Sequence, residues 1–187
     1  MGRVTMSGAG DTAIAAAVEH RRTVAVDVIL LLMRNGRILL RERANTGYGD
    51  GAYEPPTDQL SDRETIVETA IRVAWAEAGI TIGAENVSLA HVMQDVSGSG
   101  RIAFFLTVSG WQGEYTSRGA RWFPVGNLPT NMLDRSRVAL RNYAEGMRFS
   151  TYPAFGPAGT GGGPALPGAS HWASPGTTVP WQDAYSA

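Results

Sequence analysis

Two apolar runs that meet at an Asn-Gly pair are the clearest feature of the chain. The first, TVAVDVILLLMR, ends before Asn35, and the second, RILLRER, begins after Gly36. Asn-Gly readily adopts the positive φ angles of a tight hairpin turn, so this pattern predicts two antiparallel strands. Two later runs, VSLAHVMQDV and RIAFFLTVSGW, flank SGSG and predict a second strand pair, and ARWFPVGNLP predicts one more strand.

Helical spacing of apolar residues follows the first strand pair and returns after the last strand. The first helix is predicted over about Ser61–Ala78, because Ser61 and Glu64 fit a capping box and Gly79 fits a helix stop. A second helix is predicted over Asp134–Met147. This order of elements predicts an α/β (α+β) sandwich in which a mixed β-sheet packs between helices.

The composition divides the chain into three parts. Residues 1–22 are expected to form an N-terminal extension with a short helix over Asp11–Arg22, and residues 23–148 are expected to form the folded domain. Residues 149–187 are expected to form a flexible tail, because the last 38 residues contain 7 Gly, 6 Pro and one acidic residue, Asp183.

Charge and composition exclude several classes of chemistry. The net charge of −1 gives no strong attraction to nucleic acid or to an anionic membrane. Without lysine or cysteine the chain has no Schiff base, P-loop, thiolate nucleophile, disulfide or Cys-based zinc site. The longest apolar stretch is too short to span a membrane, and the 16 basic residues, all arginine, are typical of a GC-rich bacterial genome. We expect a cytoplasmic protein with a small-molecule ligand and no nucleic-acid or membrane partner; a homodimer is compatible with the sequence.

The stretch Asp58–Ile80 resembles the sequence box of the Nudix hydrolase family, G-x5-E-x7-R-E-U-x-E-E-x-G-U, where U is a bulky aliphatic residue. The first glutamate, the arginine, the last glutamate and the final glycine of the box correspond to Glu64, Arg72, Glu77 and Gly79. The hairpin before the box and the strands after it also follow the family order. The resemblance therefore implies a Nudix fold.

The resemblance also implies a chemistry. Family members cleave diphosphates in nucleoside diphosphates linked to another group, and glutamates of the box hold Mg²⁺ or Mn²⁺. Positions 73, 76 and 77 are expected on one face of the helix, but Val73 and Ala76 replace two of the three glutamates. Mg²⁺ requires several hard oxygen ligands. Glu77 is thus the remaining candidate metal ligand, and standard metal-dependent hydrolysis is not expected to be intact.

The resemblance and the local chemistry give a set of candidate site residues. The catalytic candidates are Glu77, Glu64 and Asp58; the substrate-binding candidates are Arg41, Arg43, Asn45 and Tyr48; and Arg72 and Gly79 are structural residues of the box. In the family the arginine orients the glutamates of the box, so Arg72 is expected to orient Glu77. Structural alternatives remain open. Glu64 could be only a helix cap, Asp58 only a turn residue, and Arg72 the i,i+4 partner of Glu68.

Three functions remain open from the sequence. The first is a Nudix-type hydrolase with a relocated metal site. The second is a metal-independent enzyme of secondary metabolism that uses the Nudix pocket, with Asp58, Glu64 or His91 as acid or base. The third is a non-catalytic binding or regulatory module with the Nudix fold. For His91, which lies in an apolar strand, a structural role is the alternative.

Overall fold

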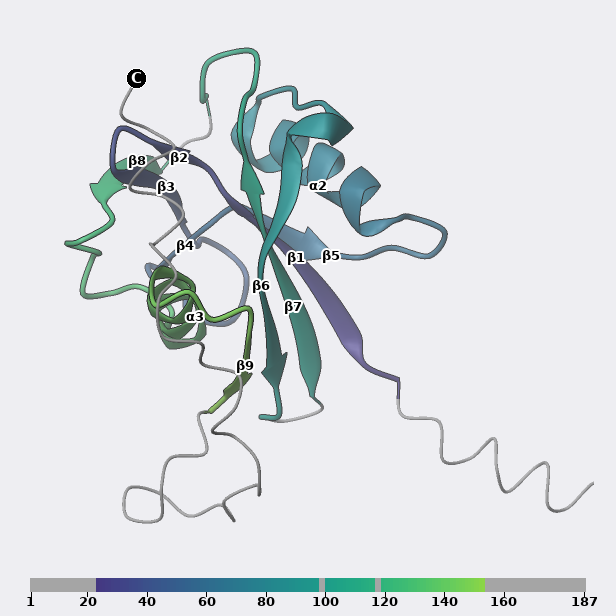
Figure 1. The fold of residues 1–187 in the computed structure, drawn as a ribbon. Coiled ribbons are helices and arrows are strands. Elements are labelled where there is room, and N and C mark those ends of the chain that lie inside the picture. Colours follow the sequence, from purple (N-terminus) through teal and green to yellow (C-terminus); the bar gives the residue numbers. More distant parts are fainter. Residues whose placement is uncertain (1–22, 98–99, 117–118, 154–187) are drawn as a thin grey trace, which may run out of the picture.

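The computed structural model describes residues 23–97, 100–116 and 119–153, and Figure 1 shows how their strands and helices are arranged. The helix predicted over residues 11–22 and most of the predicted tail lie outside the described residues.

A five-stranded mixed sheet forms the centre of the fold. Its order is β5 (Thr57–Gln59), β1 (Ala25–Leu31), β7 (Arg101–Val108), β6 (Val87–Asp95) and β9 (Phe149–Tyr152). β1 runs parallel to β7 and β9 runs parallel to β6, while the other neighbours are antiparallel. The four residues of β9, which the composition assigns to the tail, are thus part of the sheet.

A smaller antiparallel sheet is built around β3. It contains β2 (Met33–Arg34), β3 (Arg37–Glu42), β4 (Tyr53–Glu54) and β8 (Ala120–Pro124), and both β4 and β8 pair with β3. Asn35 and Gly36 connect β2 to β3 with φ angles of 52° and 67°, which confirms the predicted hairpin turn.

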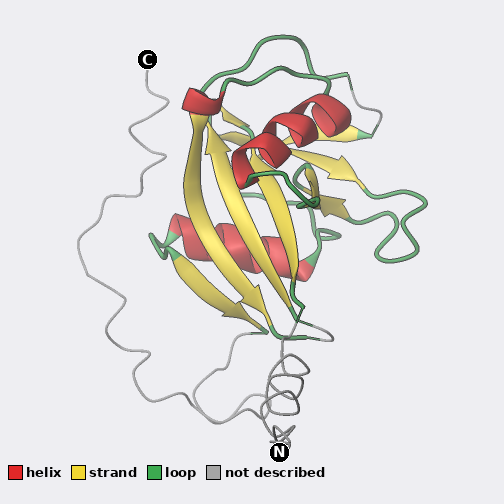
Figure 2. Cartoon of the chain, turned by 90° about the vertical axis from the view of Figure 1, so that its right-hand side faces the viewer, coloured by secondary structure: helices red, strands yellow, loops and turns green. Residues whose placement is uncertain are grey.

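The large sheet lies between two helices, α2 (Ile66–Val73) on one face and α3 (Asp134–Ala144) on the other (Figures 1 and 2). Alternate residues of β1 enter the two cores: Val28 and Leu30 pack in the cluster that contains α2, while Ile29 and Leu31 pack in the cluster that contains α3. A strand that is buried on both faces has no polar face to expose, which explains the unbroken apolar run.

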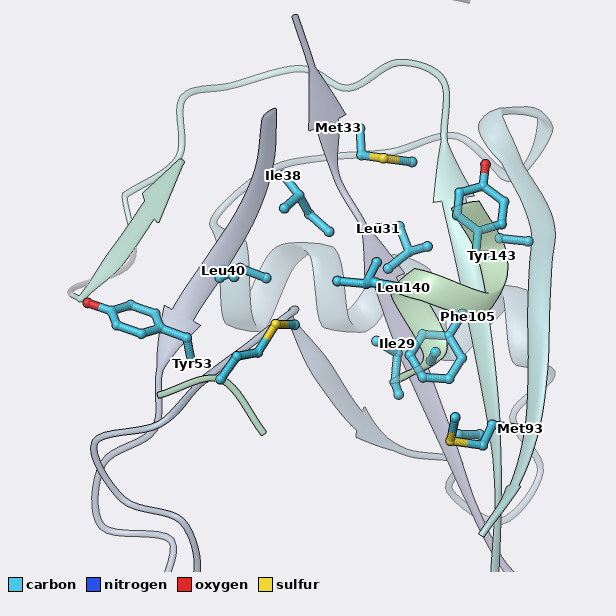
Figure 3. Close-up of a cluster of buried hydrophobic side chains, with 14 residues drawn as sticks. Ile29, Leu31, Met33, Ile38, Leu40, Tyr53, Met93, Phe105, Leu140 and Tyr143 are labelled. Atoms are coloured by element: carbon cyan, nitrogen blue, oxygen red, sulfur yellow. The ribbon is translucent and has the colours of Figure 1, made fainter. Parts of the chain in front are cut away.

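The core on the α3 side is filled by residues from both sheets and the helix. Figure 3 shows Ile29 and Phe105 of the large sheet, Ile38 and Leu40 of the small sheet, and Leu140 of α3 within one cluster. The predicted fold class, a mixed sheet packed between helices, is confirmed.

Helix α2 begins later than the predicted start at Ser61. Its N-cap is Thr65, whose hydroxyl accepts a hydrogen bond from the Glu68 N–H at 3.2 Å, while the Glu68 carboxylate accepts from the Thr65 N–H at 2.8 Å. Arg63, with φ of 70°, breaks a helix that would start at Ser61. The capping box is therefore Thr65–Glu68. The expected pair of Glu68 with Arg72 is wrong, because the Glu68 carboxylate is used at the cap.

Helix α2 continues into a π-helical turn over Ala74–Ala78, and the two together form the helix of the sequence box, here called the box helix. Gly79 then ends the helix with φ of 70°, as the sequence predicts, and its N–H donates to the Trp75 carbonyl at 3.0 Å. The π-helical turn has a wider repeat than an α-helix, so side-chain directions near Glu77 differ from those expected from α-helical spacing.

Candidate functional site

A pocket of about 680 Å³ opens near one end of the large sheet. This volume lies within the usual range for small-molecule sites. Its walls come from β1, β3 and the loop after it, the β4–β5 segment, the facing ends of β6 and β7 with their connection, the start of α3 with the residues before it, and β9. The lining residues are Asp27, Arg41, Arg43, Thr46, Tyr48, Glu54, Thr57, Asp58, Gln59, Asp95, Ser97, Arg101, Met132, Leu133, Asp134, Arg135 and Tyr152.

The loop after β3 is organised by Arg43. Its guanidinium pairs with the buried Glu54 carboxylate, and it donates to the Tyr48 carbonyl and to the Thr46 hydroxyl, each at 3.0 Å. Arg43 and Tyr48 both line the pocket. Tyr48 is 72% exposed. Asn45 is also described by the structure but does not line the pocket. Its φ of 58° shows that it is a turn residue of this loop.

Arg41 lies between the pocket and the box helix. Its NH1 is 2.9 Å from Glu77 Oε2, and its NH2 is 3.5 Å from Glu54 Oε1. Arg41 lines the pocket, whereas Glu77, which the structure also describes, does not. The guanidinium that pairs with Glu77 is thus that of Arg41 and not that of Arg72, so the expected orientation of Glu77 by Arg72 is wrong.

Arg72 instead binds the two other acidic candidates. It donates to both carboxylate oxygens of Glu64, at 2.8 and 2.9 Å, and to Asp58 Oδ2 at 2.5 Å. Hydrogen bonding from Arg72 lowers the pKa of Glu64 to about 2, and the same carboxylates raise the pKa of Arg72. Arg72 therefore holds the β5–α2 connection against the helix, and the Glu64 carboxylate stays ionised near neutral pH.

The replaced positions of the box lie in different environments. Val73 is 0% exposed and belongs to the core cluster on the α2 side. Ala76 is exposed, and Glu77 is partly buried. The expectation that positions 73, 76 and 77 share one ligand-facing side is therefore wrong, because Val73 is buried in the core and the π-helical turn follows it.

The side chains present do not fit the divalent-metal site that the family implies. The described residues contain no group of three or more His, Cys, Asp or Glu side chains placed to hold a metal ion. The Glu77 carboxylate is paired with Arg41 and the Glu64 carboxylate with Arg72. Mg²⁺ is held through carboxylates that are open to it, so this donor set does not match the metal.

A second ion cluster in the pocket was not predicted from the sequence. Asp27, which is 3% exposed, accepts from Arg101 Nε at 2.8 Å and from Arg135 NH1 at 3.1 Å. Pairing with Asp27 raises the pKa of Arg101. Asp27 is the sequence feature that could have predicted this cluster, because a single charged residue inside an apolar strand requires a partner when it is buried.

His91 has the structural role that the sequence left open. It is 0% exposed, and its ring nitrogens lie 2.9 Å from the Met147 carbonyl and 2.8 Å from the Ser150 hydroxyl. Burial lowers the pKa of His91, which favours the neutral ring. It therefore joins β6 to β9 and to the residues just before β9, and it does not line the described pocket.

A mixed sheet packed between two helices, with the end of the box helix joined to the pocket residue Arg41, is the arrangement expected of a Nudix-type domain. A sequence model of the NUDIX domain matches residues 21–143. The chain belongs to the Nudix family, whose hydrolases bind small-molecule substrates and generally use divalent metals.

Solved structures show the same fold. The MutT NUDIX hydrolase of Burkholderia pseudomallei superposes with a TM-score of 0.56 at 22% identity, covering 64% of this chain and 97% of that one. The Escherichia coli ORF135 protein superposes with a TM-score of 0.53 at 18% identity, and the match covers 64% of this chain and 87% of that one. The MutT protein of Bacillus halodurans superposes with a TM-score of 0.51 at 20% identity, and the match covers 63% of this chain and 80% of that one. No curated protein sequence matches the chain. None of the helices in the described residues is long and apolar enough to cross a membrane.

Proposed function

We propose that this protein is a Nudix-fold binding module that takes a phosphate-bearing, nucleotide-type small molecule into its pocket and does not carry out metal-dependent diphosphate hydrolysis. The observation that carries this proposal is the ion pair between Arg41 and Glu77 beside an open pocket. The last carboxylate at the metal positions of the box is neutralised by the protein, while the space for a ligand remains.

The lining of the pocket supports an anionic ligand with a ring system. A guanidinium has five N–H donors; the ion pairs with Asp27 use two donors of Arg101 and one of Arg135 within the described structure. Further donors on these arginines can bind phosphate oxygens in the bidentate manner that arginine favours. The exposed ring of Tyr48 offers a stacking surface at the same pocket.

The geometry favours binding over metal-independent acid–base catalysis. A general acid or base works best with a pKa near the operating pH, whereas Arg72 lowers the pKa of Glu64 to about 2. Asp58 is paired with the same arginine, and His91 is enclosed in the fold. The three acid–base candidates from the sequence are thus engaged in structural contacts.

Calorimetry and a turnover assay on the same samples test the proposal. ADP, GDP, ADP-ribose and UDP-glucose would each be titrated with Mg²⁺, with Mn²⁺ or with EDTA, and chromatography would measure cleavage. We expect saturable binding of at least one ligand, unchanged by EDTA and without products, and no binding of adenosine. Turnover that requires either metal, or no binding of any phosphate ligand, would overturn the proposal.

A matched pair of variants on α3 connects binding to the pocket. Arg135→Gln removes a pocket guanidinium, whereas Arg141→Gln changes an exposed arginine of the same helix that lies outside the described lining. We expect Arg135→Gln to weaken binding about tenfold or more, because a hydrogen bond between charged groups is lost, and Arg141→Gln to bind like the wild type.

A further inference from the structure

A second pocket lies on the small sheet, where β2 and β8 flank the start of β3 (Figure 1). Its volume is about 340 Å³, near the lower end of the usual range for small-molecule sites. The lining residues are Arg34, Asn35, Arg37 and Trp122. None of them lines the pocket described above, so the two cavities are separate.

The strand register places both arginines and the tryptophan on one face of the small sheet. Arg34 of β2 lies directly opposite Arg37 of β3, so their side chains leave the sheet on the same side. Leu39 follows two residues after Arg37 and is paired with Trp122 of β8. Because residues two apart on a strand share a face, Trp122 lies on the side of the two arginines.

The two arginines carry an electrostatic cost that the described structure does not offset. Like charges directly opposite each other on antiparallel strands are destabilising. Within the described residues, neither Arg34 nor Arg37 forms a hydrogen bond or an ion pair through its side chain; the Arg34 guanidinium instead lies 4.7 Å from the centre of the Trp111 ring. A stacked guanidinium keeps the N–H donors in its plane available. An anion bound between the two arginines would relieve their repulsion.

Trp122 adds a flat apolar surface beside these charges. Its indole is partly exposed and stacks on that of Trp111, with ring centroids 6.4 Å apart and an angle of 19° between the planes. The ring also packs against the core cluster on the α2 side. Its orientation is therefore held by the fold, and the part that faces the pocket can stack with another aromatic ring.

We propose that this pocket is a second binding site, for a mononucleotide-type ligand that combines a flat ring with one phosphate group. The ring stacks on Trp122, and the phosphate binds Arg34 and Arg37. A phosphate monoester has a charge of about −1.5 to −2 at neutral pH, which matches two guanidinium groups better than a single carboxylate does. Arginine also binds phosphate oxygens in a bidentate manner. The site goes beyond the proposed function and does not depend on it.

Tryptophan fluorescence of the full chain tests the site, because no tryptophan lines the first pocket. AMP, adenosine and inorganic phosphate would each be titrated. We expect saturable quenching by AMP, and binding at least about tenfold weaker for adenosine and for phosphate, since each offers half of the recognised chemistry. Equal affinity for AMP and adenosine, or no saturable quenching by AMP, would overturn the proposal.

Three variants assign the signal to the second pocket. Arg37→Gln removes one of the paired charges at an exposed position, so the fold is expected to persist, and the affinity for AMP should fall about tenfold or more. Arg121→Gln is the matched control: Arg121 is an exposed arginine of β8 that is paired with Leu40 and therefore lies on the opposite face. Arg135→Gln changes the first pocket. We expect both of these variants to be quenched by AMP like the wild type.

Each outcome of the variant series decides between the two pockets. Quenching that is lost in Arg135→Gln and retained in Arg37→Gln would place AMP in the first pocket and overturn the second site. Equal AMP affinities of Arg37→Gln and Arg121→Gln would also overturn it. The tests of the proposed function use Arg135→Gln, calorimetry and metal-dependent turnover, so their failure would leave the loss of AMP binding in Arg37→Gln as independent support for the second site.

Discussion

Restoring the first missing glutamate of the box, Val73→Glu, tests where that position lies. Val73 is 0% exposed in the core cluster on the α2 side. Removing the valine side chain from this core costs about 1.5–3 kcal/mol, and burying a neutral carboxyl there without a partner costs about 1–3 kcal/mol more. The expected loss of about 2.5–6 kcal/mol is a large part of the roughly 5–15 kcal/mol by which domains are stable.

The pH dependence of this variant has a definite sign. Burial raises the pKa of the introduced glutamate in the folded state above its value in the unfolded chain, roughly 4.3. Above that pH the unfolded state releases the proton more readily, so the free energy of unfolding falls further as pH rises, by up to about 1.4 kcal/mol per pH unit until the folded pKa is reached.

Urea denaturation followed by circular dichroism at pH 5 and pH 8 measures both effects. Val73→Gln is the uncharged control, which should be destabilised without the added pH dependence. Ala76→Glu, at an exposed position of the same helix, should stay within about 0.5 kcal/mol of the wild type. Val73→Glu with wild-type stability, or with the pH dependence of Val73→Gln, would refute the placement of residue 73 in the core.

Two further predictions concern the ends of the box helix. Glu64→Gln should lower stability at neutral pH, and the difference from the wild type should shrink as pH falls from about 4.5 toward 2. The reason is that the lowered pKa of Glu64 stabilises the fold only while the carboxylate is ionised. Urea denaturation across this pH range measures the difference, and a difference that stays constant would contradict the prediction. Gly79→Ala should cost about 2 kcal/mol or more, because φ is 70° and the added Cβ would lie 2.5 Å from Thr116 Oγ1. Gly126→Ala, where the added Cβ meets nothing within 4 Å, is its control in thermal denaturation, and equal melting temperatures would contradict the prediction.

The sequence predicts those parts of the fold that depend on local patterns. The Asn35–Gly36 turn, the apolar runs of the central strands and the stop at Gly79 each have a local physical cause, and all three are confirmed. The start of α2 is harder to predict, because S-x-x-E and T-x-x-E occur in succession and only the left-handed Arg63 decides between them.

The candidate site depends on contacts that no local pattern contains. Arg41 and Glu77 are 36 positions apart, and their contact exists only because β3 and the end of the box helix lie side by side. Spacing along a regular α-helix also cannot reveal the π-helical turn at Ala74–Ala78. Fold class is therefore predictable from this sequence, while the partners of its acidic residues require the structure.

Strand β9 belongs to the folded domain although it lies beyond the end of the family match. The match ends at residue 143, whereas β9 ends at Tyr152. Ser150 holds the ring of His91, and Tyr152 forms part of the pocket wall. A version of the protein shortened to the family boundary would lose a sheet edge, the anchor of a buried imidazole and one side of the ligand pocket together, so a binding defect in such a version would reflect lost architecture.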